Sequence, residues 1–313
     1  MEEFKQTANE IEIIGLIKSI NLEKDNSLDA IKGYIVVEVV EEDVVNNIRV
    51  ELFSKQFKKD GSENSLYKGY VTINDEYKSI DNDGRENADY VRVTGRINGN
   101  MYASRQDGSL HESVRVQGTF VNRIDKEKEQ QALAQMDLLI KGMTDIADSE
   151  GIPTGDKRVE AYFVEYGNKV SKMTDLEVHG ELADQFDQLF ASGDTAQITM
   201  KIQNYASNVE ATPEISGGFG VQKNLSAGSN FTRNFVIVGG SMPYQEPLAF
   251  SEDQINDLME LYTKRKETVS ELNNGGISKQ QTSGFGNAQT VSGNPFEGGN
   301  TNTNSSNVEG WDF

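Results

Sequence analysis

Cysteine is absent from the 313 residues of this chain, and histidine occurs only twice, as His111 and His179. Without cysteine no disulfide can form, so a reducing interior is the natural setting of the protein. A zinc site would need carboxylates to complete it, because neither histidine has a second ligand at helical or hairpin spacing. We therefore expect no metal site and interpret both histidines as ordinary surface residues.

Long apolar runs are also missing. The longest, such as YIVVEVV (34–40), have the length of a strand and are far too short to span a bilayer. The N-terminus, MEEFKQTANE, is acidic and polar and does not resemble a signal peptide. These features predict a soluble, intracellular protein.

The motifs of common enzyme classes are not found. The sequence has no G-x-x-x-x-G-K-[ST] phosphate loop and no G-x-S-x-G nucleophile elbow. DNDG (81–84) resembles half of a calcium loop, but it lacks the later ligands, and a turn is the better interpretation. A carboxylate pair acting on phosphodiesters with magnesium stays open as an alternative, yet nothing selects one pair. We predict a protein that is not an enzyme and needs no cofactor.

Positive charge is scarce, with 30 basic residues against 50 acidic ones and a net charge of −20. This balance argues against a surface that binds polyanions or anionic membranes generally. It leaves room for a local basic groove, which is what nucleic-acid binding requires.

The first 125 residues are rich in predicted strands. IEIIGLIKSINL (11–22), YIVVEVV (34–40), IRVELF (48–53), YVRVTGRI (90–97) and SVRVQGTF (113–120) contain many β-branched residues, mostly in alternation. Asp-Gly and Asn-Gly pairs between them predict tight turns. Segment 60–88 is interpreted as an elaborated loop or hairpin. Residues 1–125 are thus predicted to form one small barrel.

The remainder divides into four segments. Residues 126–150 place apolar side chains three and four positions apart, which predicts an amphipathic linking helix. Residues 151–250 are again rich in strands, with a helix expected at 181–191. A C-terminal helix is predicted at 251–273, where Ser251 and Gln254 have capping-box spacing. Residues 274–313 are mainly Gly, Asn, Ser, Thr and Gln, a composition that predicts a disordered tail.

One strand pattern occurs twice. ADYVRVTGRINGN (88–100) and GDTAQITMKIQN (193–204) align when Asp89 is placed on Asp194, which sets Val93 on Ile198 and Arg96 on Lys201. A short helix, a Gly-Asp pair and such a strand are typical of the second half of an OB-fold barrel. We therefore predict a mainly β protein with a few helices, built from two small OB-like barrels and a disordered C-terminal tail.

The chain resembles the bacterial and bacteriophage single-stranded DNA-binding proteins. The resemblance covers the β-rich core from YIVVEVV to VRVQGTFVNRI, and the plan of a barrel, a Gly/Asn/Gln-rich linker and a short acidic tip ending in phenylalanine. In that family the tip recruits replication and repair enzymes, which implies a partner-binding tip at Glu309, Trp311, Asp312 and Phe313. This tip lacks the family's usual proline and most of its acids. Two barrels in one chain suit a phage or plasmid version, located in the host bacterial cytoplasm.

Binding of single strands without sequence preference needs cations along the phosphates and aromatic faces for the bases, each stacked base contributing about 1–3 kcal/mol. The first barrel concentrates both kinds of side chain against an acidic background. The candidate nucleic-acid-binding residues are Tyr34, Arg49, Phe53, Lys55, Phe57, Lys58, Lys59, Arg92, Arg96, Tyr102, Arg105 and Arg115.

Simpler interpretations stay open for these side chains. An outward Arg or Lys on a strand commonly does no more than solvate its face. Phe53 and Phe57 can pack under segment 60–88, and Tyr67, Tyr70 and Tyr77 can anchor that segment instead of stacking on bases. The tail can be a passive solubilising terminus, although two rings at its tip favour a partner.

The sequence thus predicts a non-catalytic protein that coats single-stranded DNA during phage replication or recombination, the first barrel carrying most of the binding. Its partners would be single-stranded DNA and the replication or recombination proteins that the tip contacts. The principal alternative is a structural or assembly protein of a virion that does not bind DNA. A nuclease with scattered carboxylates is the second.

Overall fold

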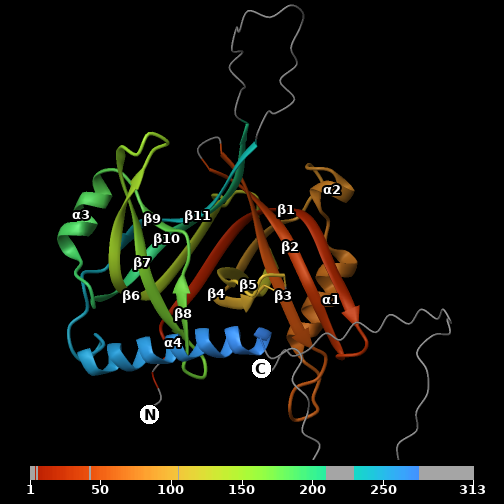
Figure 1. The fold of residues 1–313 in the computed structure, drawn as a ribbon. Coiled ribbons are helices and arrows are strands. Elements are labelled where there is room, and N and C mark those ends of the chain that lie inside the picture. The colour runs from red at the N-terminus through yellow and green to blue at the C-terminus, as the bar shows by residue number, and fades with distance from the viewer. Residues whose placement is uncertain (1–3, 5, 42–43, 105, 209–228, 275–313) are drawn as a thin grey trace, which may run out of the picture. The chain divides into compact units, whose positions relative to one another are not determined.

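The computed structural model describes residues 4, 6–41, 44–104, 106–208 and 229–274. The chain divides into two units, Met1–Gly276 and Ile277–Phe313, and every described element belongs to the first. Its strands form a single 11-stranded sheet with the order β2-β3-β5-β4-β1-β6-β10-β11-β9-β7-β8. Additional pairings of β1 with β2 and of β6 with β7 close this sheet at both ends (Figure 1).

The first closed end is a five-stranded barrel. It contains β1 (Asn9–Asp25), β2 (Ala30–Glu41), β3 (Val44–Lys55), β4 (Tyr90–Ala103) and β5 (Leu110–Arg123). Each strand pairs with the next around the ring β1-β2-β3-β5-β4-β1, and only β3 and β5 run parallel. This connectivity, with a helix between the third and fourth strands, is that of an OB-fold.

The helix between those strands is α1 (Ser65–Glu76), followed by the short α2 (Ile80–Asp83). Asn64 caps α1 by accepting a hydrogen bond from the Leu66 backbone N–H at 3.1 Å, and Tyr70 and Ile73 are buried against the barrel. The prediction of a loop or hairpin for 60–88 was therefore wrong. Gly69 and the β-branched residues of this segment have low helix propensity, and the burial of one face in the barrel core overrides it.

The second closed end repeats the same connectivity. Its strands are β6 (Gln131–Ala147), β7 (Pro153–Glu165), β8 (Lys169–Met173), β9 (Leu176–Val178), β10 (Thr195–Asn208) and β11 (Ser229–Gly240), with α3 (Glu181–Leu189) between β9 and β10. The ring is β6-β7-β9-β11-β10-β6, and only β9 and β11 run parallel. β8 and β9 together take the place of the third strand. The prediction of two OB-like barrels is confirmed.

The duplicated strand pattern has a structural counterpart. β4 and β10 are the fourth strand of their barrels, and each pairs with the first strand of its own barrel. Val93 and Ile198 are buried in the core, whereas Arg96 and Lys201 lie on the opposite face of their strands. Equivalent positions in the two copies therefore face the same way.

The linking helix predicted for 126–150 does not form, because β6 occupies this segment. Ala132, Ala134, Met136, Leu138 and Ile140 are buried on one face of β6, while Leu139 on the other face packs under α4. Register shifts after Ile140 and Asp145 break the alternation further along. Apolar residues on both faces and two bulges imitate a helical period, which explains the error. The second barrel consequently begins at residue 131 and not at 151.

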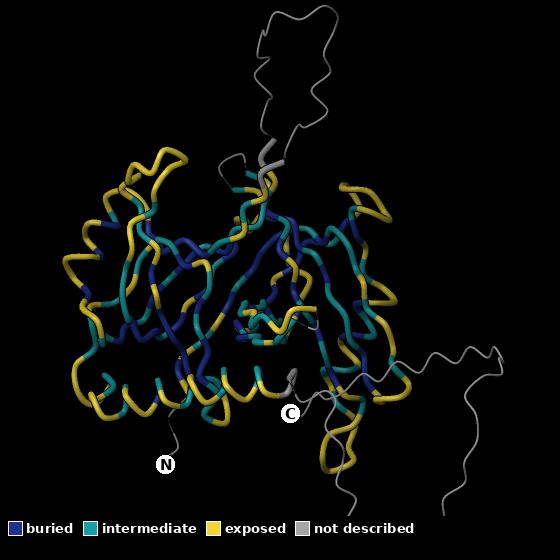
Figure 2. The backbone as a smooth tube through the Cα atoms, in the orientation of Figure 1, coloured by how far each residue is buried: buried dark blue, intermediate teal, exposed yellow. Residues whose placement is uncertain are grey.

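The two barrels share their first strands. Residues Asn9–Ile14 of β1 pair with Gln131–Met136 of β6, so the sheet passes from one barrel to the other without an edge. One hydrophobic core runs through both, from Ile11 and Ile13 to Met136 and Ile198. Figure 2 shows the buried backbone continuing across this junction, with the exposed residues at the turns and along α4.

The last described element is α4 (Glu252–Asn274), close to the helix predicted at 251–273. The capping box is present, since Ser251 N donates to Gln254 Oε1 at 2.9 Å and Gln254 N donates to Ser251 Oγ at 3.3 Å. Leu258 and Tyr262 of α4 pack on Leu139, Tyr162 and Val164. Among the helices of the described segments, none has the length and apolar character needed to cross a membrane. From residue 275 onward, the tail predicted for 274–313 lies outside the described residues.

Candidate nucleic-acid interface

The outer face of the first barrel carries most of the candidate side chains. Alternation along β3 buries Ile48, Val50 and Leu52, so Arg49, Glu51 and Phe53 point away from the core, as the sequence predicts. Strand register sets Tyr34 opposite Glu51, Glu51 opposite Gln117, and Gln117 opposite Arg96. These four residues form one row of outward side chains across β2, β3, β5 and β4.

A cluster of arginines surrounds this row. The Arg49 guanidinium carbon lies 3.8 Å from the centroid of the Tyr34 ring. Glu51 lies between two cations, with Oε1 3.8 Å from Arg49 Nη2 and Oε2 3.4 Å from Arg115 Nη1. One carboxylate thus balances two guanidinium groups on this part of the face, which leaves a net positive charge.

Arg96 and Arg92 lie further along β4 and differ in their partners. Arg96 is exposed and donates to Gln117 Oε1 at 3.3 Å, and no other described residue forms an ion pair with it. Arg92 forms an ion pair with Glu12 of β1, whose other oxygen accepts from Gln131 Nε2 at 2.5 Å. Arg96 is therefore the cation more readily available to a phosphate.

Lysines extend the face past the end of β3. Phe53 is half-buried opposite Lys32, whose ammonium lies 2.7 Å from Asp25 Oδ2. The hydrogen bond from Lys32 holds the pKa of Asp25 well below its usual range and, in return, raises the pKa of Lys32. Beyond them lie exposed Lys55, Lys58 and Lys59, none of which forms an ion pair with another described residue, and Phe57, whose ring is 46% exposed.

The remaining candidates are Tyr102, which lies apart from this cluster, and residues that the structure does not describe. Tyr102, 50% exposed, stacks on His111 near the tip of the β4–β5 hairpin, their ring centroids 5.3 Å apart. Arg105 lies outside the described residues. So do Glu309, Trp311, Asp312 and Phe313, the predicted partner-binding tip.

The tyrosines of segment 60–88 anchor it. Tyr70 is buried and donates to the carbonyls of Gly118 and Thr119, each at 3.1 Å. Tyr77 donates to the Val121 carbonyl at 3.3 Å, and the Arg123 guanidinium lies 4.0 Å from its ring centroid. Tyr67 packs against the same core. Of the two interpretations left open for these residues, the structure selects anchoring.

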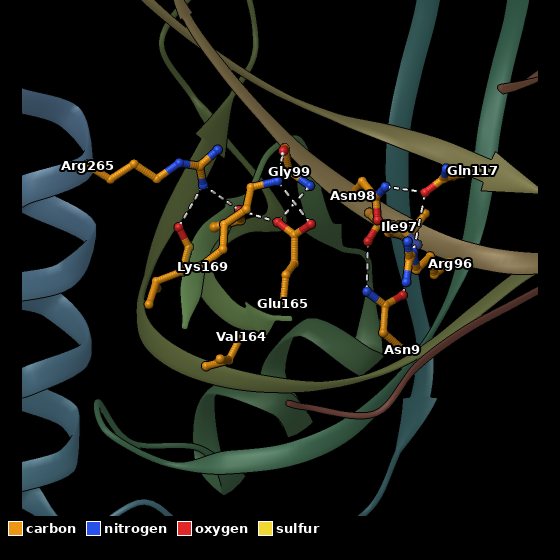
Figure 3. A network of polar contacts seen from close by, with 12 residues as sticks. Asn9, Arg96, Ile97, Asn98, Gly99, Gln117, Val164, Glu165, Lys169 and Arg265 are labelled. Carbon is orange, nitrogen blue, oxygen red and sulfur yellow. Dashed lines mark hydrogen bonds and ion pairs between the residues drawn. The ribbon is translucent and has the colours of Figure 1, made fainter. Parts of the chain in front are cut away.

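The β4–β5 hairpin is fixed to the second barrel by the polar network of Figure 3. Gly99 N donates to Glu165 Oε1 at 3.1 Å, and Lys169 Nζ donates to the Gly99 carbonyl at 2.8 Å. Ser171 Oγ donates to Glu165, and Arg265 of α4 donates to Ser171 Oγ. Because burial disfavours the charged form, the pKa of Arg265 is lowered. These bonds hold the β4–β5 hairpin against the second barrel and α4.

A groove of about 540 Å³ lies where the outer faces of the barrels meet, lined by residues of β1, β4, β5, β6 and β10. Its exposed ring, Phe120, was missed by sequence reasoning. Val114, Val116 and Gly118 point inward, so uninterrupted alternation would place residue 120 inward as well. A bulge inserts Thr119, since Gly95 pairs with Gly118 and Thr94 with Phe120, and the Phe120 ring becomes 56% exposed.

Both histidines have partners within hydrogen-bond distance. His179 Nε2 lies 3.2 Å from Glu177, and His111 Nε2 lies 2.9 Å from Ser109 Oγ. Within the segments that the structure describes, no three His, Asp or Glu side chains gather as metal ligands would.

Comparison with known proteins gives one family and several structural likenesses. Residues 7–275 match the model of the YorF family, and no curated protein matches the chain. The single-stranded DNA-binding protein from Thermus aquaticus is 12% identical, with a TM-score of 0.48 over 80% of this chain and 100% of that one. A deletion mutant of it gives a TM-score of 0.49 over 79% and 98%, at 12% identity. A Replication Protein A heterotrimer bound to ssDNA is 11% identical, with a TM-score of 0.20 over 85% and 54%.

Proposed function

The chain belongs to the YorF family, and we propose that it is a non-catalytic protein that binds single-stranded DNA without sequence preference. The observation that carries the proposal is the outward row Tyr34–Glu51–Gln117–Arg96 with its flanking arginines, on the strands of an OB barrel. OB-folds that bind single strands combine a positive groove with aromatic side chains for base stacking.

The chemistry of the face suits a flexible strand. Arg49, Arg96 and Arg115 would contact phosphates, while Tyr34, Phe53 and Phe57 present ring surface between and beyond these cations. The arginines and lysines of this face stand against a net charge of −20 for the whole chain, so we expect this face to attract phosphates. A duplex keeps its bases stacked inside and would gain only the phosphate contacts, which favours the single strand.

The wider biological role follows the resemblance to single-stranded DNA-binding proteins. We place the protein in the replication or recombination of a phage genome in the bacterial cytoplasm, with the C-terminal tip Glu309–Phe313 recruiting partner enzymes. Support for the recruitment comes from the sequence, where two aromatic residues, Trp311 and Phe313, occur in a hydrophilic segment.

The test is a fluorescence anisotropy titration of oligo-dT with the wild-type protein and a variant carrying Arg49→Ala, Arg96→Ala and Arg115→Ala. Three lost phosphate contacts should lower the slope of log K against log salt by about 2, at roughly 0.7 per contact. Lys264→Ala on α4 is the control, because Lys264 is an exposed cation paired with Glu260. Equal affinity and slope for the triple variant and the wild type would reject this face as the binding surface.

A further inference from the structure

The groove between the barrels continues the outward row described above. Two residues before Arg96 on β4 lies Thr94, which pairs with Phe120 on β5 and with Glu12 on β1. Glu12 pairs in turn with Leu133 on β6, and Leu133 with Lys201 on β10. A second row of outward side chains therefore crosses five strands and links the two barrels. It starts beside Gln117 and Arg96, where the first row ends.

The groove differs in its chemistry from the face that carries Arg49, Arg96 and Arg115, which we call the arginine face. Arg92 and Glu12 neutralise one another within it, and the exposed Glu10 at its rim adds a negative charge. Such a lining does not favour a phosphate. The groove instead offers the Phe120 ring, the apolar Leu133, and the amide and hydroxyl groups of Gln131, Gln135 and Thr199. Amide side chains can both donate to and accept from the edges of bases.

We infer that this groove binds an unstacked nucleobase of the strand that the arginine face holds, with the base stacked on Phe120. The inference rests on the proposed function, because the arginine face supplies the strand. A volume of about 540 Å³ falls in the range of about 300–1,000 Å³ typical of small-molecule sites. Gln131 and Gln135 line the groove and would face the edge of the base.

The position of the groove explains why a base and not a phosphate enters it. A single strand that follows the first row has its phosphates on Arg49, Arg115 and Arg96, and its next bases reach the bulge at Thr119. There the bulge turns Phe120 outward into the path of the strand. The continuous ladder β5-β4-β1-β6-β10 keeps Thr199 at a constant place relative to Phe120.

The inference is tested with a set of single-stranded oligonucleotides in which one abasic site is moved along the strand. A hairpin at one end of the oligonucleotide limits the register in which the protein can bind, so the positions stay comparable. The wild-type protein should lose roughly 5- to 150-fold in affinity at the position that enters the groove, the change that corresponds to about 1–3 kcal/mol for one stacked base.

Phe120→Ala should lower the affinity for the intact strand by a similar factor and abolish the sensitivity to the abasic site at that position. Phe120→Tyr should preserve both. Tyr166→Ala is the matched control, because Tyr166 is an aromatic residue 82% exposed in the turn between β7 and β8, away from the groove lining. Phe120 is itself largely exposed, so its replacement should leave the fold intact, which the unfolding midpoint of each variant verifies.

The outcomes separate the two claims. Binding that depends on the three arginines but is unchanged by Phe120→Ala at every abasic position would overturn the groove and leave the proposed function standing. Absence of single-strand binding by the wild type at low salt would overturn both. Loss of the abasic response with Phe120→Ala but not with Tyr166→Ala supports the inference.

Discussion

The guanidinium of Arg49 on β3 lies over the ring of Tyr34 on the neighbouring strand β2, 3.8 Å from the ring centroid. The ring limits where the guanidinium can lie, and Glu51 Oε1 lies 3.8 Å from Arg49 Nη2. The arginine is thus held in position on the outer face before any ligand arrives, which reduces the entropy lost when it binds a phosphate.

Removal of the ring should weaken binding without removing a charge. Tyr34→Ala is expected to lower the affinity for oligo-dT about two- to fivefold, since an exposed cation–π contact is worth about 0.5–1 kcal/mol. The salt slope should stay that of the wild type, because Arg49 keeps its charge. Tyr34→Phe preserves the ring and serves as the control. Identical losses in both variants would mean that the hydroxyl, and not the ring, matters.

Neutralising Glu51 should strengthen binding. The carboxylate lies between Arg49 and Arg115 and competes with phosphates for both. Exposed ion pairs are worth about 0.2–1 kcal/mol each, so Glu51→Gln is expected to raise the affinity severalfold at low salt and to have less effect at high salt. Glu260→Gln on α4 is the matched control, since it also removes one exposed charge. A lower affinity of Glu51→Gln than of the wild type would show that Glu51 contributes more by positioning the two arginines than it costs by repelling phosphates.

Attachment of the β4–β5 hairpin should depend on the absence of a side chain at residue 99. A Cβ on Gly99 would overlap the Ser171 side chain, and overpacking of this kind costs about 1–3 kcal/mol. We expect Gly99→Ala to lower the free energy of unfolding in urea by that amount and Ser171→Gly in the same chain to restore part of it. Gly142→Ala is the control, because a Cβ there meets no atom. Equal effects at the two glycines would argue that backbone entropy dominates.

Stability should fall at alkaline pH through Tyr70. Burial raises the pKa of Tyr70 to about 12, whereas an unfolded tyrosine ionises near 10. The native state then holds the phenolic proton over this window, so stability is complete below pH 10 and declines as pH rises from 10 to 12. Between pH 10 and 11 the contribution is about 1 kcal/mol. The urea unfolding midpoint should fall less between pH 9 and pH 11 for Tyr70→Phe than for the wild type. An unchanged difference would assign the alkaline loss to other groups.

The strands and the barrel type were predictable because period-two alternation can be recognised within a short stretch of sequence, as in IRVELF and YVRVTGRI. The duplication of the fourth strand was visible for the same reason. β6 was not predictable, because it is buried on both faces around Leu139 and bulged after Ile140, and both conditions depend on residues distant in sequence. The helix α1 likewise depends on the barrel surface that covers Tyr70.

The candidate site likewise contains residues that local sequence predicts and residues that depend on distant contacts. Arg49, Arg96 and Arg115 were identified from alternation, and the register brings them onto one face. Phe120 was missed because one inserted residue, Thr119, reverses its direction, and no local signal marks that bulge. Arg92 was identified as outward, yet its pairing with Glu12 is set by the contact between β1 and β4.

Binding of single strands by this protein is tested by an equilibrium titration of an oligo-dT of about 35 nucleotides and of the matching duplex, each at two salt concentrations. This length spans two OB barrels at about 4–16 nucleotides each. We expect preferential binding of the single strand, with an affinity that falls as salt rises. No binding to either DNA at low salt, or equal binding to both, would contradict it.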